Sequence, residues 1–365
     1  MRILVVNTGS SSVKLRVLDS SETLLARHDL APTDGGSLHD AMAAALSELP
    51  AADVVGHRVV HGGAEFRHPV VVNDSVLARL ERLAPLAPLH QPAALAGIVA
   101  TTGAAPHLPA VACFDTAFHA TLPAAATTYA VPESWRRDHG LRRYGFHGLS
   151  HAYATRRVAE LLGQDPGRLV VAHLGAGASL AAVRDGRCRD TTMGFTPDEG
   201  LVMATRTGSV DPGMLLWLLQ EEKLDLDELA DGLHRRGGLQ ALAGSPDMRT
   251  VLREADAGRD RAQRAVEVYL HRLRAGIAAM AASLGGLDTL VFTGGVGEHQ
   301  PTIRAGAVRD MAFLGPAVDA TANASAQADQ EITAAGAACR TFVVSSREDL
   351  QIAHGVRRLL AAGNQ

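Results

Sequence analysis

A polar turn near the amino terminus carries groups suited to binding phosphate. Residues 7–12, NTGSSS, follow a short apolar run and precede Lys14. Small residues expose main-chain N–H groups and hydroxyls without bulk, and a lysine adds a compact positive charge. A solvated turn is the simpler alternative, because short motifs recur by chance. Of the 35 Lys and Arg, however, only Lys14 and Lys223 are lysines, which favours a specific role for Lys14.

An arginine and an aspartate stand at or beside apolar segments where charge is costly. Arg58 lies within VVGHRVVHGG, residues 54–63, and Asp115 ends the apolar run of VACFDTAFH, residues 111–119. A buried arginine needs a partner or a ligand. We favour a ligand, because Val60 would place an apolar wall on the same face; a structural ion pair is the alternative. Asp115 follows the expected strand, at the carboxyl end where functional groups of α/β sheets usually lie. It also fits a helix N-cap.

Two further stretches combine basic side chains with glycines. RRYGFHGLSH, residues 142–151, holds Phe146 and His147 between two glycines, and DTTMGFTPDEGLVMATRTGSVDP, residues 190–212, carries Arg206. Long loops inside compact domains are usually functional. The alternatives are a structural histidine and a surface salt bridge.

The elements expected to position these groups occur twice. Residues 3–19 predict a strand, a small-residue turn and a return strand. LVVAHLGAGASLAAVRDG, residues 169–186, repeats this pattern 166 positions later: Val5 aligns with Val171 and Gly9 with Gly175. The offset exceeds the period of a stacked repeat, so two similar domains are expected. LDTLVFTGGVGEH, residues 287–299, predicts a buried strand running into a glycine turn and a helix, which suits a bound nucleotide.

Composition agrees with a two-domain enzyme. A chain of 365 residues exceeds what one core usually supports. The net charge of -4 argues against a general nucleic-acid binder. The 3 cysteines show no metal-ligand spacing, and no apolar run predicts a membrane helix. We therefore expect a cytoplasmic protein with no nucleic-acid or membrane partner.

Ten ordered motifs together resemble the acetate kinases of the acetokinase family. They are VNTGSSSVK, GHRVVHGG, LAPLHQPA, VACFDTAFH, RRYGFHGLSH, HLGAGAS, DTTMGFTPDEGL, TRTGSVDP, FTGGVGEH and SREDLQIA, and they span nearly the whole chain. The resemblance implies an α/β protein of the actin, sugar kinase and Hsp70 type. Two duplicated domains with ribonuclease H-like sheets would flank a nucleotide cleft: 1–115 plus 349–365, and 116–348.

The resemblance also implies an activity and a set of site residues. The activity would be reversible, Mg²⁺-dependent phosphoryl transfer from ATP to acetate, giving ADP and acetyl phosphate by direct in-line attack of the carboxylate. Mn²⁺ would be an alternative metal. The resemblance also implies that the protein is a homodimer. Its roles fall on the metal ligands Asn7 and Glu348; the catalytic Asp115, His147 and Arg206; the acetate-binding Arg58, Val60, Leu89, Phe146 and Pro197; and the nucleotide-binding Ser10, Ser12, Lys14, His173, Leu174, Gly175, Ala176, Gly177, Asp247, Met248, Arg249, Gly295, Val296, Gly297, Glu298 and His299.

The sequence departs from the family pattern at several positions. Ala176, His299 and Gln91 stand where the family usually has Asn, and Leu149 stands where it has Thr. We interpret these changes as clustering on the phosphoryl donor's side, with the acetate pocket untouched. Two alternatives stay open: a propionate or other short-chain acyl kinase, and a non-catalytic nucleotide switch on the same fold.

Overall fold

The computed structural model describes residues 1–9, 12–31, 37–88 and 90–362. Its contacts divide the chain into two units. Unit 1 comprises Met1–Ala120, Phe146–Tyr153 and Arg347–Gln365; unit 2 comprises Thr121–Gly145 and Ala154–Ser346. The family resemblance implies a second domain over 116–348, whereas unit 1 also takes in residues 116–120, Phe146–Tyr153 and residues 347–348. For Phe146–Tyr153 the physical reason is main-chain contact with unit 1, because Gly148 N donates to Asp115 O at 2.8 Å.

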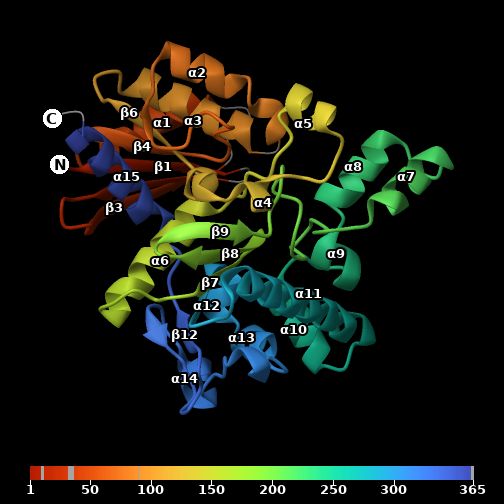
Figure 1. Ribbon diagram of the computed structural model, residues 1–365. Helices are drawn as coiled ribbons and strands as arrows, with labels where there is room; N and C mark the ends of the chain where they lie inside the picture. The colour runs from red at the N-terminus through yellow and green to blue at the C-terminus, as the bar shows by residue number, and fades with distance from the viewer. Residues whose placement is uncertain (10–11, 32–36, 89, 363–365) are drawn as a thin grey trace. The chain divides into compact units, whose positions relative to one another are not determined.

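Each unit is built on a six-stranded mixed sheet, and the two sheets have equivalent orders (Figure 1). In unit 1 the strands are ordered β3(Leu24–Leu30), β2(Val13–Leu18), β1(Ile3–Thr8), β4(Val54–Val59), β6(Ala110–Phe114) and β5(Val70–Val71). In unit 2 the order is β9(Arg187–Thr191), β8(Ala178–Arg184), β7(Leu169–Leu174), β10(Thr289–Thr293), β12(Arg340–Val343) and β11(Gln330–Glu331). The repeat predicted at residues 3–19 and 169–186 is therefore confirmed as β1–β2 and β7–β8, and so is the expected pair of duplicated α/β domains.

Helices cover the sheets. Those of unit 1 are α1(Leu38–Glu48), α2(Asp74–Glu81), α3(Gln91–Ala104) and α15(Glu348–Ala362). Helix α6(Gly148–Leu162) begins among the residues of unit 1 and ends among those of unit 2. Those of unit 2 are α4(Ala124–Thr127), α5(Glu133–His139), α7(Pro212–Gln220), α8(Leu226–His234), α9(Gly238–Ala243), α10(Met248–Asp256), α11(Asp260–Leu284), α12(Gly294–His299), α13(Pro301–Val308) and α14(Ala320–Ser325). Short 3-10 turns occupy Ala84–Leu86, Ala117–Thr121 and Ala312–Leu314.

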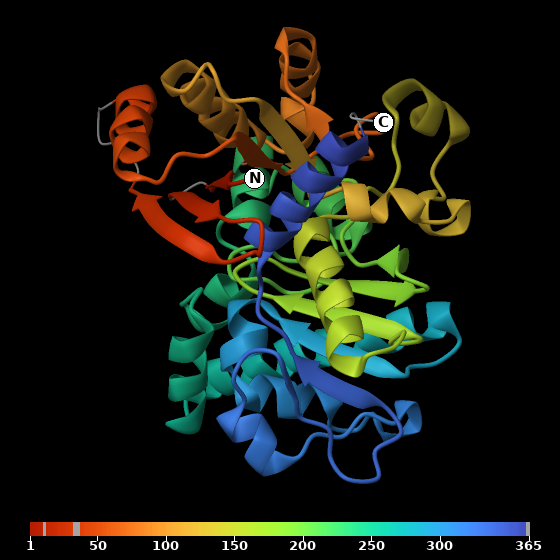
Figure 2. The same ribbon diagram turned by 90° about the vertical axis from the view of Figure 1, so that its left-hand side faces the viewer.

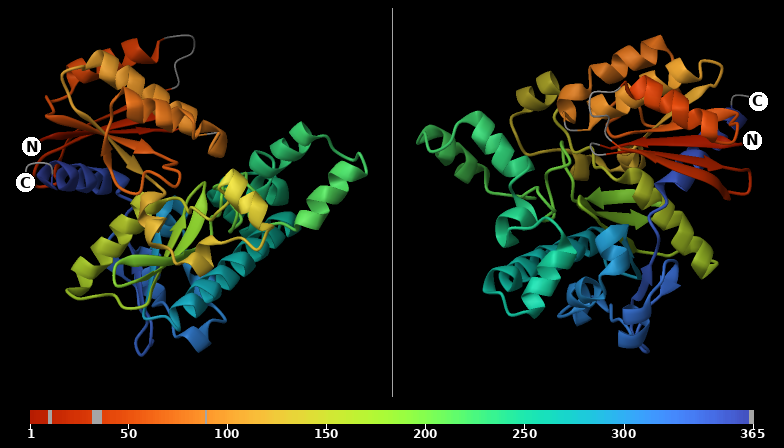
Figure 3. Two further views of the ribbon diagram at one scale, coloured as in Figure 1. Left: turned by 45° about the horizontal axis from the view of Figure 1, so that its top comes forward. Right: turned by 180° about the vertical axis from the view of Figure 1, so that it is seen from behind.

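The unit 1 sheet is covered on both faces (Figures 2 and 3). Helices α1 and α3 pack on one face, where Leu4, Val6 and Val17 form a core with Met42. Helix α15, the carboxyl-terminal helix, packs on the other face, against β1 and β4. In unit 2, α11 packs against β7, β8 and β9, and α12 follows directly from β10.

Glycines adopt the left-handed conformation after two elements. Gly63, at φ 61°, lies in the turn that follows β4, which ends at Val59. Helix α9 begins just after Gly237 and ends before Gly244, at φ 82°. A residue with a Cβ would be strained at Gly63 and at Gly244.

Docking of α15 depends on the absence of a side chain at Gly56. A Cβ at this position of β4 would lie 2.6 Å from Ile352 Cγ2 and 2.9 Å from Val356 Cγ2. We predict that Gly56→Ala lowers the free energy of unfolding by about 1–3 kcal/mol, because α15 must move away from the sheet. Urea denaturation measures the difference. Gly232→Ala, in α8 with open space around it, is the matched control and should not destabilise. Equal stability of the Gly56→Ala variant and the parent would refute the prediction.

Candidate active site

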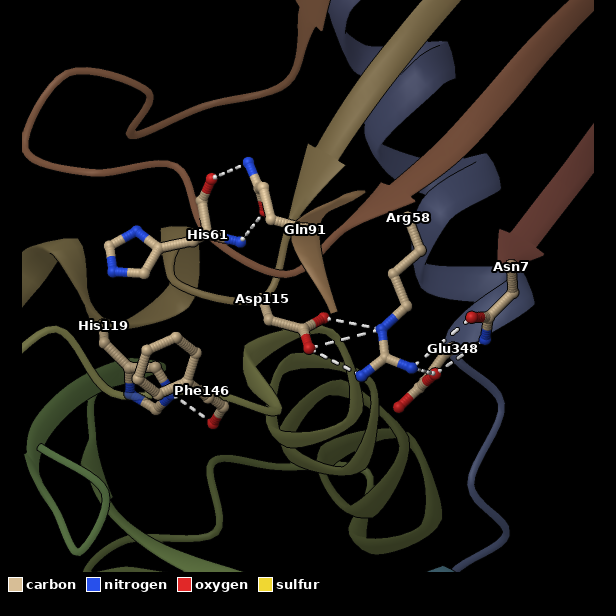
Figure 4. A network of polar contacts seen from close by, with 8 residues as sticks. All are labelled: Asn7, Arg58, His61, Gln91, Asp115, His119, Phe146 and Glu348. Atoms are coloured by element: carbon tan, nitrogen blue, oxygen red, sulfur yellow. Dashed lines mark hydrogen bonds and ion pairs between the residues drawn. The ribbon is translucent and has the colours of Figure 1, made fainter. Parts of the chain in front are cut away.

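A buried ion-pair cluster lies at the ends of β1, β4 and β6 in unit 1 (Figure 4). Arg58 Nε donates to Asp115 Oδ1 at 3.0 Å, and Arg58 Nη2 donates to Asp115 Oδ2 at 2.6 Å. On the other side of the guanidinium, Nη1 lies 3.3 Å from Glu348 Oε2 and 3.4 Å from Asn7 Oδ1. Asn7 Nδ2 closes the ring by donating to Glu348 Oε2 at 3.1 Å. Four predicted site residues are thus brought together.

Strand geometry and a helix start explain this meeting. Arg58 and Asp115 lie at or just after the ends of the parallel strands β4 and β6, and Asn7 lies near the end of β1, parallel to β4. Glu348 is the first residue of α15, where a carboxylate is favoured by the helix dipole. Lys14 is paired directly with Asn7 in the β1–β2 register, so the two side chains lie on the same face of the sheet. The side chain of Lys14 is exposed.

The cluster is held by electrostatics in a nearly dry environment. The side chain of Asp115 is 1% exposed and that of Arg58 is 20% exposed. Burial disfavours the charge of Arg58, but the carboxylates of Asp115 and Glu348 outweigh it and raise the pKa of Arg58 above its usual value. Burial raises the pKa of Asp115, although Arg58 opposes that shift. The observed contacts of the Asp115 carboxylate are with Arg58, so the helix-cap alternative does not describe it.

A second group of predicted residues lies beside this cluster in the same unit. Val60 follows β4 and Phe146 precedes α6, and both are buried, with 7% and 1% of their surfaces exposed. His147 adopts φ 56°, a left-handed conformation that is strained for a residue with a Cβ. Gly148 must be a glycine, because a Cβ there would lie 2.0 Å from Asp115 O. The Phe146–Gly148 turn is therefore tightly fitted to the residue that pairs with Arg58.

Unit 2 brings together the small-residue turns of β7–β8 and β10–α12. Gly175 N donates to Gly177 O at 2.9 Å, and Gly294, at φ 78°, lies so close that a Cβ would be 2.8 Å from Leu174 O. The predicted nucleotide residues of these turns are His173, Leu174, Gly175, Ala176, Gly177, Gly295, Val296, Gly297, Glu298 and His299. Asp247 caps α10, accepting from Arg249 N at 3.0 Å, and Met248 begins that helix.

Arg206 belongs to a loop tied to the same turns. Ala204 N donates to Ala176 O at 2.9 Å, which joins the Arg206 loop to the β7–β8 tip. Arg206 Nη1 donates to Pro197 O at 2.6 Å. Burial lowers the pKa of Arg206, and the carboxylate of Asp198 opposes this. Arg206 is thus half-buried and held by a main-chain carbonyl, not by the surface salt bridge considered as its alternative.

Sequence reasoning missed Arg304, a buried residue that supports these groups. Arg304, which is 1% exposed, donates from Nη1 to Gly297 O at 2.9 Å and to Glu298 O at 2.8 Å, and from Nε to Asn323 Oδ1 at 2.7 Å. It therefore holds the end of α12 through main-chain carbonyls. Burial lowers the pKa of Arg304 to about 10. In an arginine-rich chain, no local signal distinguishes it.

Ser10 and Leu89, two predicted ligand contacts, lie outside the described residues, and Ser12 is half-buried just before the return strand.

Among the described residues no cluster of three or more His, Cys, Asp or Glu forms a ready metal site. Gln91, one of the departures from the family pattern, bonds through its carboxamide to the main chain of His61, the residue after Val60, with both distances 3.1 Å.

Removing Arg58 should make stability depend more steeply on pH. In Arg58→Leu, Asp115 stays buried beside Glu348 without its cation, so its folded-state pKa rises further above the unfolded value near 4. The native state then binds more protons, and its stability falls as pH rises through that interval. We predict a loss of about 2–4 kcal/mol at pH 8 relative to the parent, and a smaller loss at pH 5. Urea denaturation at both pH values measures this, and Arg58→Leu with Asp115→Asn should remove the added slope. Parallel pH profiles of Arg58→Leu and the parent would contradict the assignment.

Comparisons with known proteins identify the family of this chain. The Acetokinase family model matches residues 36–354. An acetate kinase from Deinococcus deserti is 45% identical, covering 99% of this chain and 98% of its own length. The crystal structure of Porphyromonas gingivalis acetate kinase, 36% identical, has a TM-score of 0.90 and covers 98% of this chain and 99% of its own. That of a propionate kinase from Francisella tularensis, 34% identical, also has a TM-score of 0.90, covering 97% and 98%. The chain belongs to the acetokinase family, and is accordingly a kinase.

Proposed function

We propose that this kinase transfers the γ-phosphoryl group of ATP reversibly to the carboxylate of acetate, forming acetyl phosphate and ADP. The observation that carries the proposal is the half-buried Arg58, held by the buried Asp115 and by Glu348 beside Asn7. In a family whose named relatives include acetate kinases, a fixed guanidinium next to the buried Val60 suits a ligand with one carboxylate and one small apolar group.

The chemistry needs charge neutralisation more than proton transfer. A carboxylate nucleophile is already ionised at pH 7, so no general base is required. Repulsion between the attacking carboxylate and the phosphates must be offset by cations. We assign Arg58 to the carboxylate of acetate, and Lys14, His147 and Arg206 to the phosphates. Asp115 acts through Arg58, which it fixes by two hydrogen bonds.

Asn7 and Glu348 fit the ligands of a magnesium ion. Both are half-buried and meet through one hydrogen bond, and the observed contacts of Glu348 use Oε2. Mg²⁺ typically takes one or two protein oxygens and completes its shell with water and substrate phosphates. The oxygens of Asn7 and Glu348 suit that mode. When bound, the metal would neutralise charge that develops on the phosphates, and Mn²⁺ could replace it.

Nucleotide binding is assigned to unit 2. The turns at Gly175–Gly177 and Gly294–His299 lie next to each other, with α12 starting at the second turn. Such an arrangement suits phosphate groups. We also assign the start of α10, at Asp247, Met248 and Arg249, to the nucleotide.

The acceptor pocket is assigned to Val60, Leu89, Phe146 and Pro197. Propionate is the second candidate acceptor, because one solved relative is a propionate kinase and one methylene changes specificity by only about 1–3 kcal/mol. We expect a cytoplasmic homodimer with no nucleic-acid or membrane partner. None of the described helices is long and apolar enough to cross a bilayer.

A hydroxamate assay for acyl phosphate tests the proposal. We predict acetyl hydroxamate from ATP, Mg²⁺ and acetate, and none when EDTA replaces Mg²⁺. We also predict a higher kcat/KM for acetate than for propionate. A higher value for propionate would assign the enzyme to the second candidate. A lack of product with every short-chain carboxylate tested would reject the carboxylate-kinase proposal.

Arginine variants test the roles assigned above. We predict that Arg206→Ala and Arg58→Ala each lower kcat by several orders of magnitude while the folded state persists, because each removes a cation from the reacting anions. Circular dichroism should show native secondary structure in both. Arg236→Ala removes an exposed arginine whose side chain is 63% accessible, and serves as the matched control with unchanged kcat. Near-normal turnover by Arg206→Ala or Arg58→Ala would remove that residue from the mechanism.

A further inference from the structure

A buried polar network connects the start of α3 to the Phe146 turn (Figure 4). Gln91, the first residue of α3, is 0% exposed. Its Oε1 accepts from His61 N at 3.1 Å, and its Nε2 donates to His61 O at 3.1 Å and to Leu80 O at 3.4 Å. One carboxamide therefore fixes the peptide groups on both sides of His61, in the loop after β4.

The ring of His61, whose main chain Gln91 holds, is in contact with the Phe146 ring. His61 is 0% exposed, and its Nδ1 accepts from Gly63 N at 2.8 Å, so the ring is neutral with its proton on Nε2. The ring meets Phe146 edge-on, with centroids 5.3 Å apart and an interplanar angle of 72°. This is a favoured geometry for aromatic pairs. The position of the Phe146 ring therefore depends on where the Gln91 carboxamide holds His61.

The main chain of Phe146 is fixed from another side. His119 Nε2 lies 2.9 Å from Phe146 O, and since a carbonyl only accepts, that nitrogen carries the proton. Burial lowers the pKa of His119 to about 4, so the ring stays neutral near pH 7. Because His119 holds the carbonyl of Phe146, a shift of His61 would chiefly move the Phe146 ring and leave its main chain in place.

We infer that Gln91 is a specificity-determining positioning residue. Through His61 it sets the separation of Val60, the preceding residue, from the Phe146 ring, which are two walls of the proposed acceptor pocket. This inference rests on the proposed carboxylate-kinase function and deepens it. Gln91 does not touch the acceptor; it acts by holding both walls at the spacing that suits a two-carbon acid.

Three variants test the inference. Gln91→Leu keeps the volume of the side chain but loses both hydrogen bonds to His61. Gln91→Asn keeps the donor and the acceptor on a chain one methylene shorter. Thr101→Val, on the same helix, removes a buried hydroxyl that donates within α3 to Gly97 O at 2.7 Å, and controls for general disturbance of α3. Native folding of each is checked by circular dichroism and thermal denaturation.

The readout is the ratio of kcat/KM for acetate to that for propionate, together with the KM for ATP. We expect Gln91→Leu to raise the KM for acetate about 10-fold and to lower the acetate preference about 10-fold, within the range that one methylene can discriminate. Gln91→Asn should retain more of the preference than Gln91→Leu. The KM for ATP should stay within about 2-fold, and Thr101→Val should match the parent.

The outcomes separate this inference from the function it rests on. A parent enzyme inactive with every short-chain carboxylate overturns both. An active parent whose acetate preference is unchanged in folded Gln91→Leu and Gln91→Asn overturns the inference alone. If Gln91→Leu does not fold, Gln91→Asn decides: an unchanged acetate preference overturns the inference, and a reduced one supports it.

Discussion

The buried pair of Arg58 and Asp115 is the interaction on which the arrangement of unit 1 depends. A guanidinium at the end of an apolar strand is tolerated only with partners, and these come from β6, from β1 and from the start of α15. Asn7 and Glu348 meet although they lie 341 positions apart in the chain. The carboxyl-terminal helix must therefore lie on the amino-terminal sheet, and the glycine at position 56 lets it approach that sheet.

The two duplicated sheets carry different residues at the ends of equivalent strands. In unit 1, the ends of β4 and β6 deliver a paired arginine and aspartate. In unit 2, the ends of β7 and β10 run into turns of small residues, with Gly294 against the main chain of Leu174. Charged side chains suit recognition of a small anion, whereas exposed main-chain N–H groups suit an extended phosphate chain. A shared topology therefore does not imply shared chemistry in this chain.

Local patterning in the sequence was enough to predict the central strands and the duplication. Buried strands are readable as short apolar runs, and the 166-residue offset revealed the duplicated hairpin, which the structure confirms as β1–β2 and β7–β8. The registers of the two hairpins differ by one residue, because Thr8 pairs with Val13 whereas Leu174 pairs with Ala178. Long-range contacts were not readable. The grouping of Phe146–Tyr153 with unit 1 depends on a main-chain bond to Asp115, and Arg304 resembles any other arginine until its buried carbonyl partners are known. Gln91 was visible as a departure from the family motif, but only its contacts with His61 show where that departure acts.

The charges of the unit 1 cluster give a physical reason for the proposed metal ligands. Arg58 contributes one positive charge, whereas Asp115 and Glu348 contribute two negative charges, so the cluster is net negative when both carboxyls are ionised. Such a cluster repels acetate and phosphate at short range, and low solvent access strengthens the repulsion. Lys14, paired with Asn7 on the neighbouring strand, could balance the excess, but it is exposed and therefore well screened. A divalent cation at Asn7 and Glu348 would make the local sum positive. On the proposed assignment, Arg58 would therefore bind an anion effectively only with a second cation next to its carboxylate partners.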